Sequence, residues 1–174
     1  MKISLNLANS LSLFRIVIAP VVAWNIISGG WVTASFLLVL AIFSNLLDGP
    51  IARKKGQESA AGGLLDHSCD AILVAVLLFV LTETHGIPLL LPILVLLSFL
   101  QYVLDSKALS GQRLRTSFLG RSNGIAYFVL ACLCIFSEVL EINLPDYLIV
   151  TFAWILIAST LLSMFERLWT LLTK

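Results

Sequence analysis

Charged residues are scarce in this chain of 174 residues: Asp, Glu, Lys and Arg together make up 12% of it, whereas 59% is hydrophobic. The mean hydropathy is +1.01. This composition excludes an ordinary soluble domain and indicates an integral membrane protein. We expect membrane lipids, and no nucleic acid, among its partners.

Cysteine and histidine are also few, with three and two residues. Cys69, Cys132 and Cys134 fall within apolar segments, where a small thiol is ordinary packing. The sequence therefore predicts neither disulfides nor a zinc site. No rival catalytic group comes from Cys or His, although His67 stands beside Asp66 and could support it.

Six apolar segments are long enough to cross a bilayer, whose core needs roughly 20 residues per helix and fewer where neighbours shield the helix. They predict an all-α integral membrane protein, a six-transmembrane-helix bundle forming a single domain over residues 1–174. A cleaved signal peptide is the alternative for the first span, but Arg15 interrupts its apolar run. The expected spans are 11–28, 31–47, 62–84, 87–104, 120–137 and 147–172.

Lys and Arg are missing from one set of predicted loops. All eleven basic residues fall on the other side of the expected membrane. The positive-inside rule therefore places both termini in the cytoplasm. The loops without basic residues hold Glu83, His85, Glu138, Glu141 and Asp146.

Acidic residues gather where the second span ends and the third begins, in NLLDGPIARKKGQESAAGGLLDHSCD, residues 45–70. Asn45 and Asp48 are three residues apart, and Asp66 and Asp70 are four apart, so each pair shares a helix face. An acid inside a span is costly unless a partner or a wet cavity offsets it. Two adjacent helices thus present three carboxylates and one amide toward a common point.

These oxygen ligands predict a divalent-cation site. Three acids so close would repel one another unless a cation joined them. Hard oxygen ligands favour Mg²⁺ or Mn²⁺ over zinc. Arg53 adds positive charge that suits a phosphate, and Gly49 lets a ligand approach the backbone. The alternative is that these polar residues merely flank helix ends.

The spacing of the same stretch resembles the signature of the CDP-alcohol phosphotransferase family, D-x-x-D-G-x-x-A-R, eight residues, G-x-x-x-D-x-x-x-D. Every fixed position matches except the first, where Asn45 stands. The resemblance implies transfer of a phosphatidyl, or other substituted phosphoryl, group from a CDP-alcohol to the hydroxyl of a polar acceptor alcohol, with release of CMP. It further implies CDP-diacylglycerol as donor, phospholipid biosynthesis, a bacterial inner membrane with the active site facing the cytoplasm, and a homodimer.

Residue roles follow from the same resemblance. Asp70 would be the general base that deprotonates the acceptor. The metal ligands would be Asn45, Asp48, Asp66 and Asp70. The contacts to the CDP-alcohol would be Asn9, Ser12, Asp48, Gly49, Arg53 and Ser59.

Two N-terminal features leave alternatives open. Asn9 and Ser12 are candidate donor contacts, but Asn9 or Ser10 could instead cap the first helix. Arg15, three residues beyond Ser12, either turns inward or snorkels to the interface.

A basic segment, DSKALSGQRLRTSFLGRSNG at 105–124, precedes and enters the fifth span. Its cations could form a pocket for an anionic acceptor such as a phosphorylated polyol, or a lipid-headgroup patch. Arg121 is the strongest single candidate because it begins the span. The four cations are Lys107, Arg113, Arg115 and Arg121.

Asn45 leaves three interpretations. It keeps an oxygen but removes one negative charge, so the chain is a working enzyme with a weaker metal site, a nucleotide- and metal-binding homologue with poor turnover, or a protein altered by design at this position. We favour the working enzyme because the other motif positions, including Asp70, are present. A small transporter is a further alternative, but it predicts an internal repeat, and none is visible.

Overall fold

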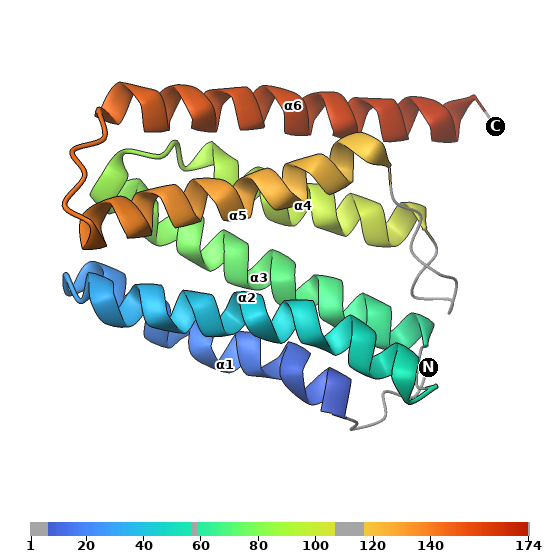
Figure 1. Cartoon of the computed structure of the whole chain (residues 1–174). Helices are drawn as coiled ribbons and strands as arrows, with labels where there is room; N and C mark the ends of the chain where they lie inside the picture. Colours follow the sequence, from blue (N-terminus) through green and yellow to red (C-terminus); the bar gives the residue numbers. More distant parts are fainter. Residues whose placement is uncertain (1–6, 57–58, 107–116, 174) are drawn as a thin grey trace.

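Six helices form a single bundle in the computed structural model, which describes residues 7–56, 59–106 and 117–173 (Figure 1). No strand occurs within these ranges. The prediction of an all-α membrane bundle is therefore confirmed. The helices are α1 Leu7–Ile27, α2 Trp31–Lys54, α3 Ala60–His85, α4 Leu90–Asp105, α5 Phe118–Val139 and α6 Asp146–Leu172.

Five of these helices are long and apolar enough to cross a membrane, and the chain is a multi-pass integral membrane protein. The exception is α4, whose 16 residues extend only about 24 Å at 1.5 Å per residue. The fourth span was predicted to begin at residue 87, but the helix begins at Leu90. Gly86 ends α3 in the left-handed conformation, with φ of 64°, and residues 86–88 are not helical.

The helix α2 is longer than the predicted span, which ended at residue 47. It continues through Gly49 and Pro50 to Lys54. Asp48, Gly49 and Arg53 therefore belong to one continuous helix, and the four-residue spacing of Gly49 and Arg53 places these two on one face.

The packing puts α3 at the centre of the bundle, in contact with α1, α4, α5 and α6 (Figure 1). The helix α1 packs against α2 and α3 and buries residues spaced four apart, such as Ile18, Val22 and Ile26. Large apolar side chains such as Trp24 and Phe36 point outward. An apolar outer surface of this kind is suited to contact with the lipid chains of a bilayer.

Alternating helix directions gather the starts of α1, α3 and α5 and the ends of α2, α4 and α6 at one end of the bundle, on the right in Figure 1. Arg53, Arg121 and Arg167 lie near this end, whereas Glu83 and Glu138 lie near the other. Asp48 and Asp66 are six residues inside helix ends at the basic end, a depth of about 9 Å.

Candidate active site

A buried arginine is the centre of the candidate site. Arg15 on α1 has no exposed surface, and its guanidinium pairs with three carboxylates from two other helices. Nη2 lies 3.0 Å from Oδ2 of Asp48 and contacts Oδ1 of Asp66, while Nε lies 3.2 Å from Oδ1 of Asp70. Arg15 therefore turns inward, and the snorkelling alternative is wrong.

The α1 sequence explains this position. Asn9, Ser12 and Arg15 follow one another at three-residue intervals, on the same stripe that carries the apolar core residues of the helix further along. The Ser12 hydroxyl lies 3.3 Å from Oδ2 of Asp48 and 3.4 Å from Oδ1 of Asp66. The first turns of α1 thus supply polar partners to the acids, and the later turns supply apolar residues to the hydrophobic core.

Asn45 faces Asp70, the last acid of the motif. Its Nδ2 donates a hydrogen bond to Oδ2 of Asp70, over 3.1 Å. The predicted convergence of α2 and α3 side chains is therefore present: Asp48, Asp66 and Asp70 surround one cation, and Asn45 holds the last of them.

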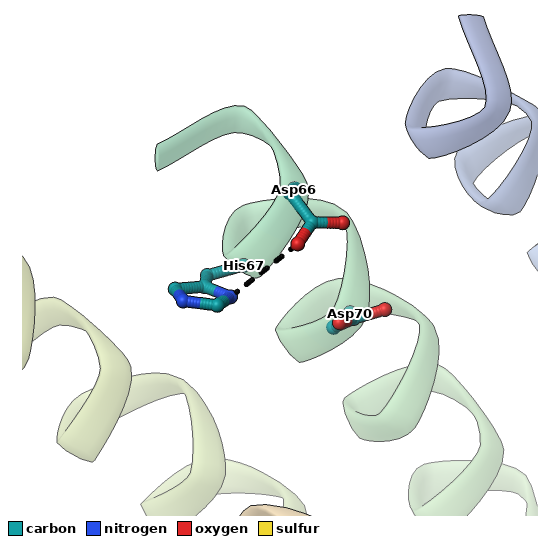
Figure 2. A group of neighbouring side chains, drawn as sticks. All are labelled: Asp66, His67 and Asp70. Carbon is teal, nitrogen blue, oxygen red and sulfur yellow. Dashed lines mark ion pairs between the residues drawn. The ribbon is translucent and has the colours of Figure 1, made fainter. Parts of the chain in front are cut away.

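Asp66, His67 and Asp70 form a smaller group on α3 whose potential ligand atoms lie within 4.8 Å of one another. Figure 2 shows the His67 ring turned back toward Asp66, with Asp70 one turn further along the helix. Nδ1 of His67 lies 3.6 Å from Oδ2 of Asp66. His67 is therefore placed to support this acid, as its position in the sequence suggested.

The donor set fits a divalent cation. Carboxylate oxygens are the ligands that Mg²⁺ and Mn²⁺ prefer. The three carboxylates already converge on a cationic group, and two buried polar atoms, Nη1 of Arg15 and Oδ1 of Asp70, have no hydrogen-bond partner among the described residues. Asp48, Asp66 and Asp70 are the residues that could hold the ion.

The predicted donor contacts lie close to these acids. The guanidinium of Arg53 lies over Gly49, where a Cβ would be 3.6 Å from Nη1. Ser59 caps α3, its hydroxyl accepting a hydrogen bond of 2.9 Å from the Gly62 N–H. A Cβ on Gly62 would lie 3.2 Å from Oδ1 of Asn9, so Asn9 packs against the start of α3.

Asn9 and Ser10 both lie inside α1, which begins at Leu7. An N-cap residue stands before the first turn of its helix. The capping alternative for these two residues is therefore wrong.

A cavity of about 500 Å³ opens beside Asp66 and Asp70, between α3, α4, α5 and α6. Its lining also includes Arg121, Arg167 and Tyr102, from α5, α6 and α4. Arg121 is thus the one predicted acceptor residue that the described structure brings to the site. Lys107, Arg113 and Arg115 lie outside the described residues.

Arg167 on α6 is a cavity residue that the sequence analysis missed. Its guanidinium lies 4.7 Å from the centre of the Tyr102 ring, donates to the Ser117 hydroxyl over 3.2 Å, and lies 3.6 Å from Oδ2 of Asp105. These partners come from α4 and the start of α5. Only its place within an apolar span could have marked Arg167 in the sequence.

A second cavity, of about 600 Å³, lies between α2 and α5. It shares Asn45, Ile125 and Phe128 with the first cavity, so the two adjoin. The rest of its lining is almost entirely apolar, with side chains such as Leu46 and Phe136. A hydrocarbon chain would fit such a lining.

A family model described as CDP-alcohol phosphatidyltransferase matches residues 5–166 of the chain. This match covers the candidate site from Asn9 to Arg121, and it ends one residue before Arg167. It agrees with the family that the motif resembles.

Curated proteins from several organisms are similar to part of the chain. The chain is 42% identical over 81 residues to the cardiolipin synthase (CMP-forming) of Homo sapiens, covering 46% of this chain and 27% of that protein. It is 35% identical over 79 residues to the CDP-diacylglycerol--glycerol-3-phosphate 3-phosphatidyltransferase 1, chloroplastic, of Oryza sativa subsp. japonica, covering 45% and 24%. The CDP-diacylglycerol--glycerol-3-phosphate 3-phosphatidyltransferase of Wigglesworthia glossinidia brevipalpis is 29% identical over 97 residues, 53% of each chain. The matched stretch thus spans only part of each relative's length.

Proposed function

The chain belongs to the CDP-alcohol phosphatidyltransferase family, and we propose that it transfers a phosphatidyl group from CDP-diacylglycerol to the hydroxyl of a polar acceptor alcohol, with release of CMP. The observation that carries this proposal is the convergence of Asp48, Asp66 and Asp70 beside a cavity that holds two arginines. The human relative is named as CMP-forming, and the rice relative is named for CDP-diacylglycerol and glycerol 3-phosphate; both names support the proposal.

Divalent metal is part of this proposal. Mg²⁺ or Mn²⁺ held by Asp48, Asp66 and Asp70 would neutralise charge on the diphosphate of the donor. The ligands come from α2 and α3, which a short connection joins near the basic end of the bundle. A donor lipid anchored in the bilayer would present its headgroup at this level.

The donor nucleotide would lie over the starts of α1 and α3 and the end of α2. Asn9, Ser59 and the Gly62 backbone lie together at the starts of α1 and α3, and Arg53 lies over Gly49 near the end of α2. Glycine there leaves room for a phosphate, and an arginine guanidinium is a strong phosphate partner. Ser12, between Asp48 and Asp66, completes the proposed donor contacts.

Asp70 would act as the general base. Its carboxylate borders the cavity and would accept the proton of the acceptor hydroxyl. The acceptor oxygen then bonds to the phosphorus that carries diacylglycerol, and the bond from this phosphorus to the oxygen of CMP breaks. CMP leaves with the electron pair of that bond.

The acceptor would occupy the cavity and carry an anionic group. Arg121 and Arg167 both line this cavity, and an arginine pair favours phosphate over a neutral alcohol. Arg167 is already held by Tyr102, Ser117 and Asp105, so less side-chain entropy is lost when it binds. The adjoining apolar cavity between α2 and α5 would take an acyl chain.

The charge pattern supports a cytoplasmic site. Basic residues lie at the end of the bundle that holds the acids, and the positive-inside rule would place this end, with both termini, in the cytoplasm. A bacterial inner membrane is the membrane we propose.

Release of CMP tests the proposed function. The purified protein is incubated with CDP-diacylglycerol and Mg²⁺ or Mn²⁺, and CMP is measured with glycerol 3-phosphate, inositol phosphate, serine, choline or phosphatidylglycerol as acceptor. We expect metal-dependent CMP release with a phosphorylated acceptor, and none with EDTA. If no acceptor releases CMP while nucleotide still binds, the chain is instead a nucleotide- and metal-binding relative.

Replacing Arg121 by Gln tests the acceptor cavity. A hydrogen bond to a charged group contributes about 1.5–3 kcal/mol, so the KM for a phosphorylated acceptor should rise roughly 10- to 150-fold. The KM for CDP-diacylglycerol should stay within about twofold, because Arg121 lies away from the proposed donor contacts. Initial rates at varied acceptor and varied donor separate the two constants.

Lys54→Gln is the matched control for this change. Lys54 is exposed at the same end of the bundle but does not line the cavity. If Arg121→Gln and Lys54→Gln have equal effects on the KM for the acceptor, Arg121 belongs to a lipid-headgroup patch and not to an acceptor pocket.

A further inference from the structure

Asn45 presents its amide N–H, and not its oxygen, to Asp70. The two side chains meet over 3.1 Å, between Nδ2 and Oδ2. An ionised carboxylate can only accept hydrogen bonds, so the group that faces it has to be the NH₂. Asn45 therefore orients the carboxylate of Asp70, and the amide adds no negative charge to the site.

Arg15 sets the charge that remains for a metal. It is fully buried and pairs with Asp48, Asp66 and Asp70, so one of three negative charges is already balanced within the protein. With these carboxylates ionised, two unit charges are left over. Buried charge is costly unless it is balanced, and one divalent cation balances these two.

Unsatisfied hydrogen-bonding atoms point to the same gap. Nη1 of Arg15 is buried and has no hydrogen-bond partner among the described residues. Oδ1 of Asp70 is buried as well, and it makes an ion pair of 3.2 Å with Nε of Arg15 but no hydrogen bond within the described residues. A wholly buried guanidinium with one nitrogen unpaired indicates a site that is completed by a ligand.

We propose that the protein without nucleotide holds one divalent cation, not two, and that Asn45 is a positioning residue for Asp70. The role of this cation in phosphatidyl transfer rests on the proposed function. The number of bound cations does not, because it follows from the charges of Arg15 and the three acids. An Asp at position 45 would raise the leftover charge from two to three. It would thereby make a second cation favourable.

The number of bound ions tests this proposal. Mn²⁺ is titrated into the full chain in detergent without nucleotide, with calorimetry to count ions and electron paramagnetic resonance to detect coupled pairs. We expect one uncoupled Mn²⁺ per chain. For Asn45→Asp we expect a second, coupled Mn²⁺ and a first ion that binds at least about tenfold more tightly, because a unit charge is added close by. Two ions in the unaltered chain would overturn the proposal.

Asn45→Ala separates positioning from ligation. We expect its single Mn²⁺ to bind within about threefold of the unaltered affinity, because the amide is not a ligand in this proposal. In the CMP assay kcat should fall at least about tenfold, with the KM for CDP-diacylglycerol unchanged, and Asn45→Gln, which keeps an amide donor, should recover part of kcat. Loss of Mn²⁺ binding in Asn45→Ala would show that Asn45 is a ligand.

The ion count and the proposed function can fail independently. If the chain binds one Mn²⁺ but releases no CMP with any acceptor, the count stands and the transferase proposal fails. If CMP is released but two Mn²⁺ bind without nucleotide, the transferase proposal stands and the single-cation proposal fails.

Discussion

Asp70→Asn abolishes CMP release, with an expected loss in kcat of at least about a thousandfold. The substitution removes the group that would take the acceptor proton and one of the proposed metal ligands. The side chain keeps its size, so the contacts of Asp70 with Asn45 and Arg15 are altered in charge more than in shape. Steady-state CMP release, measured at saturating donor and acceptor, gives the change in kcat.

Binding of the donor should largely survive Asp70→Asn. The proposed nucleotide contacts, Asn9, Arg53 and Ser59, come from other parts of the site. Equilibrium binding of labelled CDP-diacylglycerol should therefore change by less than about tenfold. Glu83→Gln is the control, because it makes the same acid-to-amide change at the far end of α3, where the side chain is exposed. Unchanged turnover in Asp70→Asn would remove the base assignment.

Arg15→Met destabilises the fold strongly when no divalent metal is present. Removing one partner of a buried ion pair costs about 3–5 kcal/mol, and here one guanidinium serves three carboxylates. The expected result is a fall in the midpoint of thermal unfolding in detergent, followed by tryptophan fluorescence with EDTA present. Mn²⁺ should restore part of the lost stability, because it offers the carboxylates another positive partner.

Arg53→Met provides the comparison for Arg15→Met. Arg53 is exposed, and substitutions at exposed positions usually change stability by no more than about 0.5 kcal/mol. Equal unfolding midpoints for the Arg15 and Arg53 variants would mean that Arg15 does not stabilise the acid cluster. A midpoint of Arg15→Met that Mn²⁺ leaves unchanged would mean that the acids do not bind the ion.

The helices and the acid pairs could be predicted because both depend on neighbours in the chain. Long apolar runs require helices in a bilayer, and all six predicted spans overlap observed helices. Spacings of three and four residues put Asn45 with Asp48, and Asp66 with Asp70, on common faces. The short connection between α2 and α3 then brought the two pairs together.

Helix boundaries were less predictable where the apolar run and the helix do not begin or end at the same residue. The helix α2 passes through Gly49 and Pro50, because the proline costs only one hydrogen bond near its end and the helix is supported by α1 and α5. The helix α4 begins late, after Gly86 and Pro88, although its apolar run starts earlier. Composition alone shows neither effect.

Composition established the membrane class of this protein, and apolar runs and local spacing established its helices and the shared faces of its four motif residues, Asn45, Asp48, Asp66 and Asp70. Packing established what those positions touch: that Arg15 enters the acid cluster, that the Asn45 N–H meets Asp70, and that Arg167 shares a cavity with Arg121. The reason is that residue spacing determines which side chains share one helix face. Contacts between residues 25 or 33 positions apart, and a cavity lined by residues 46 positions apart, depend on which faces of separate helices meet.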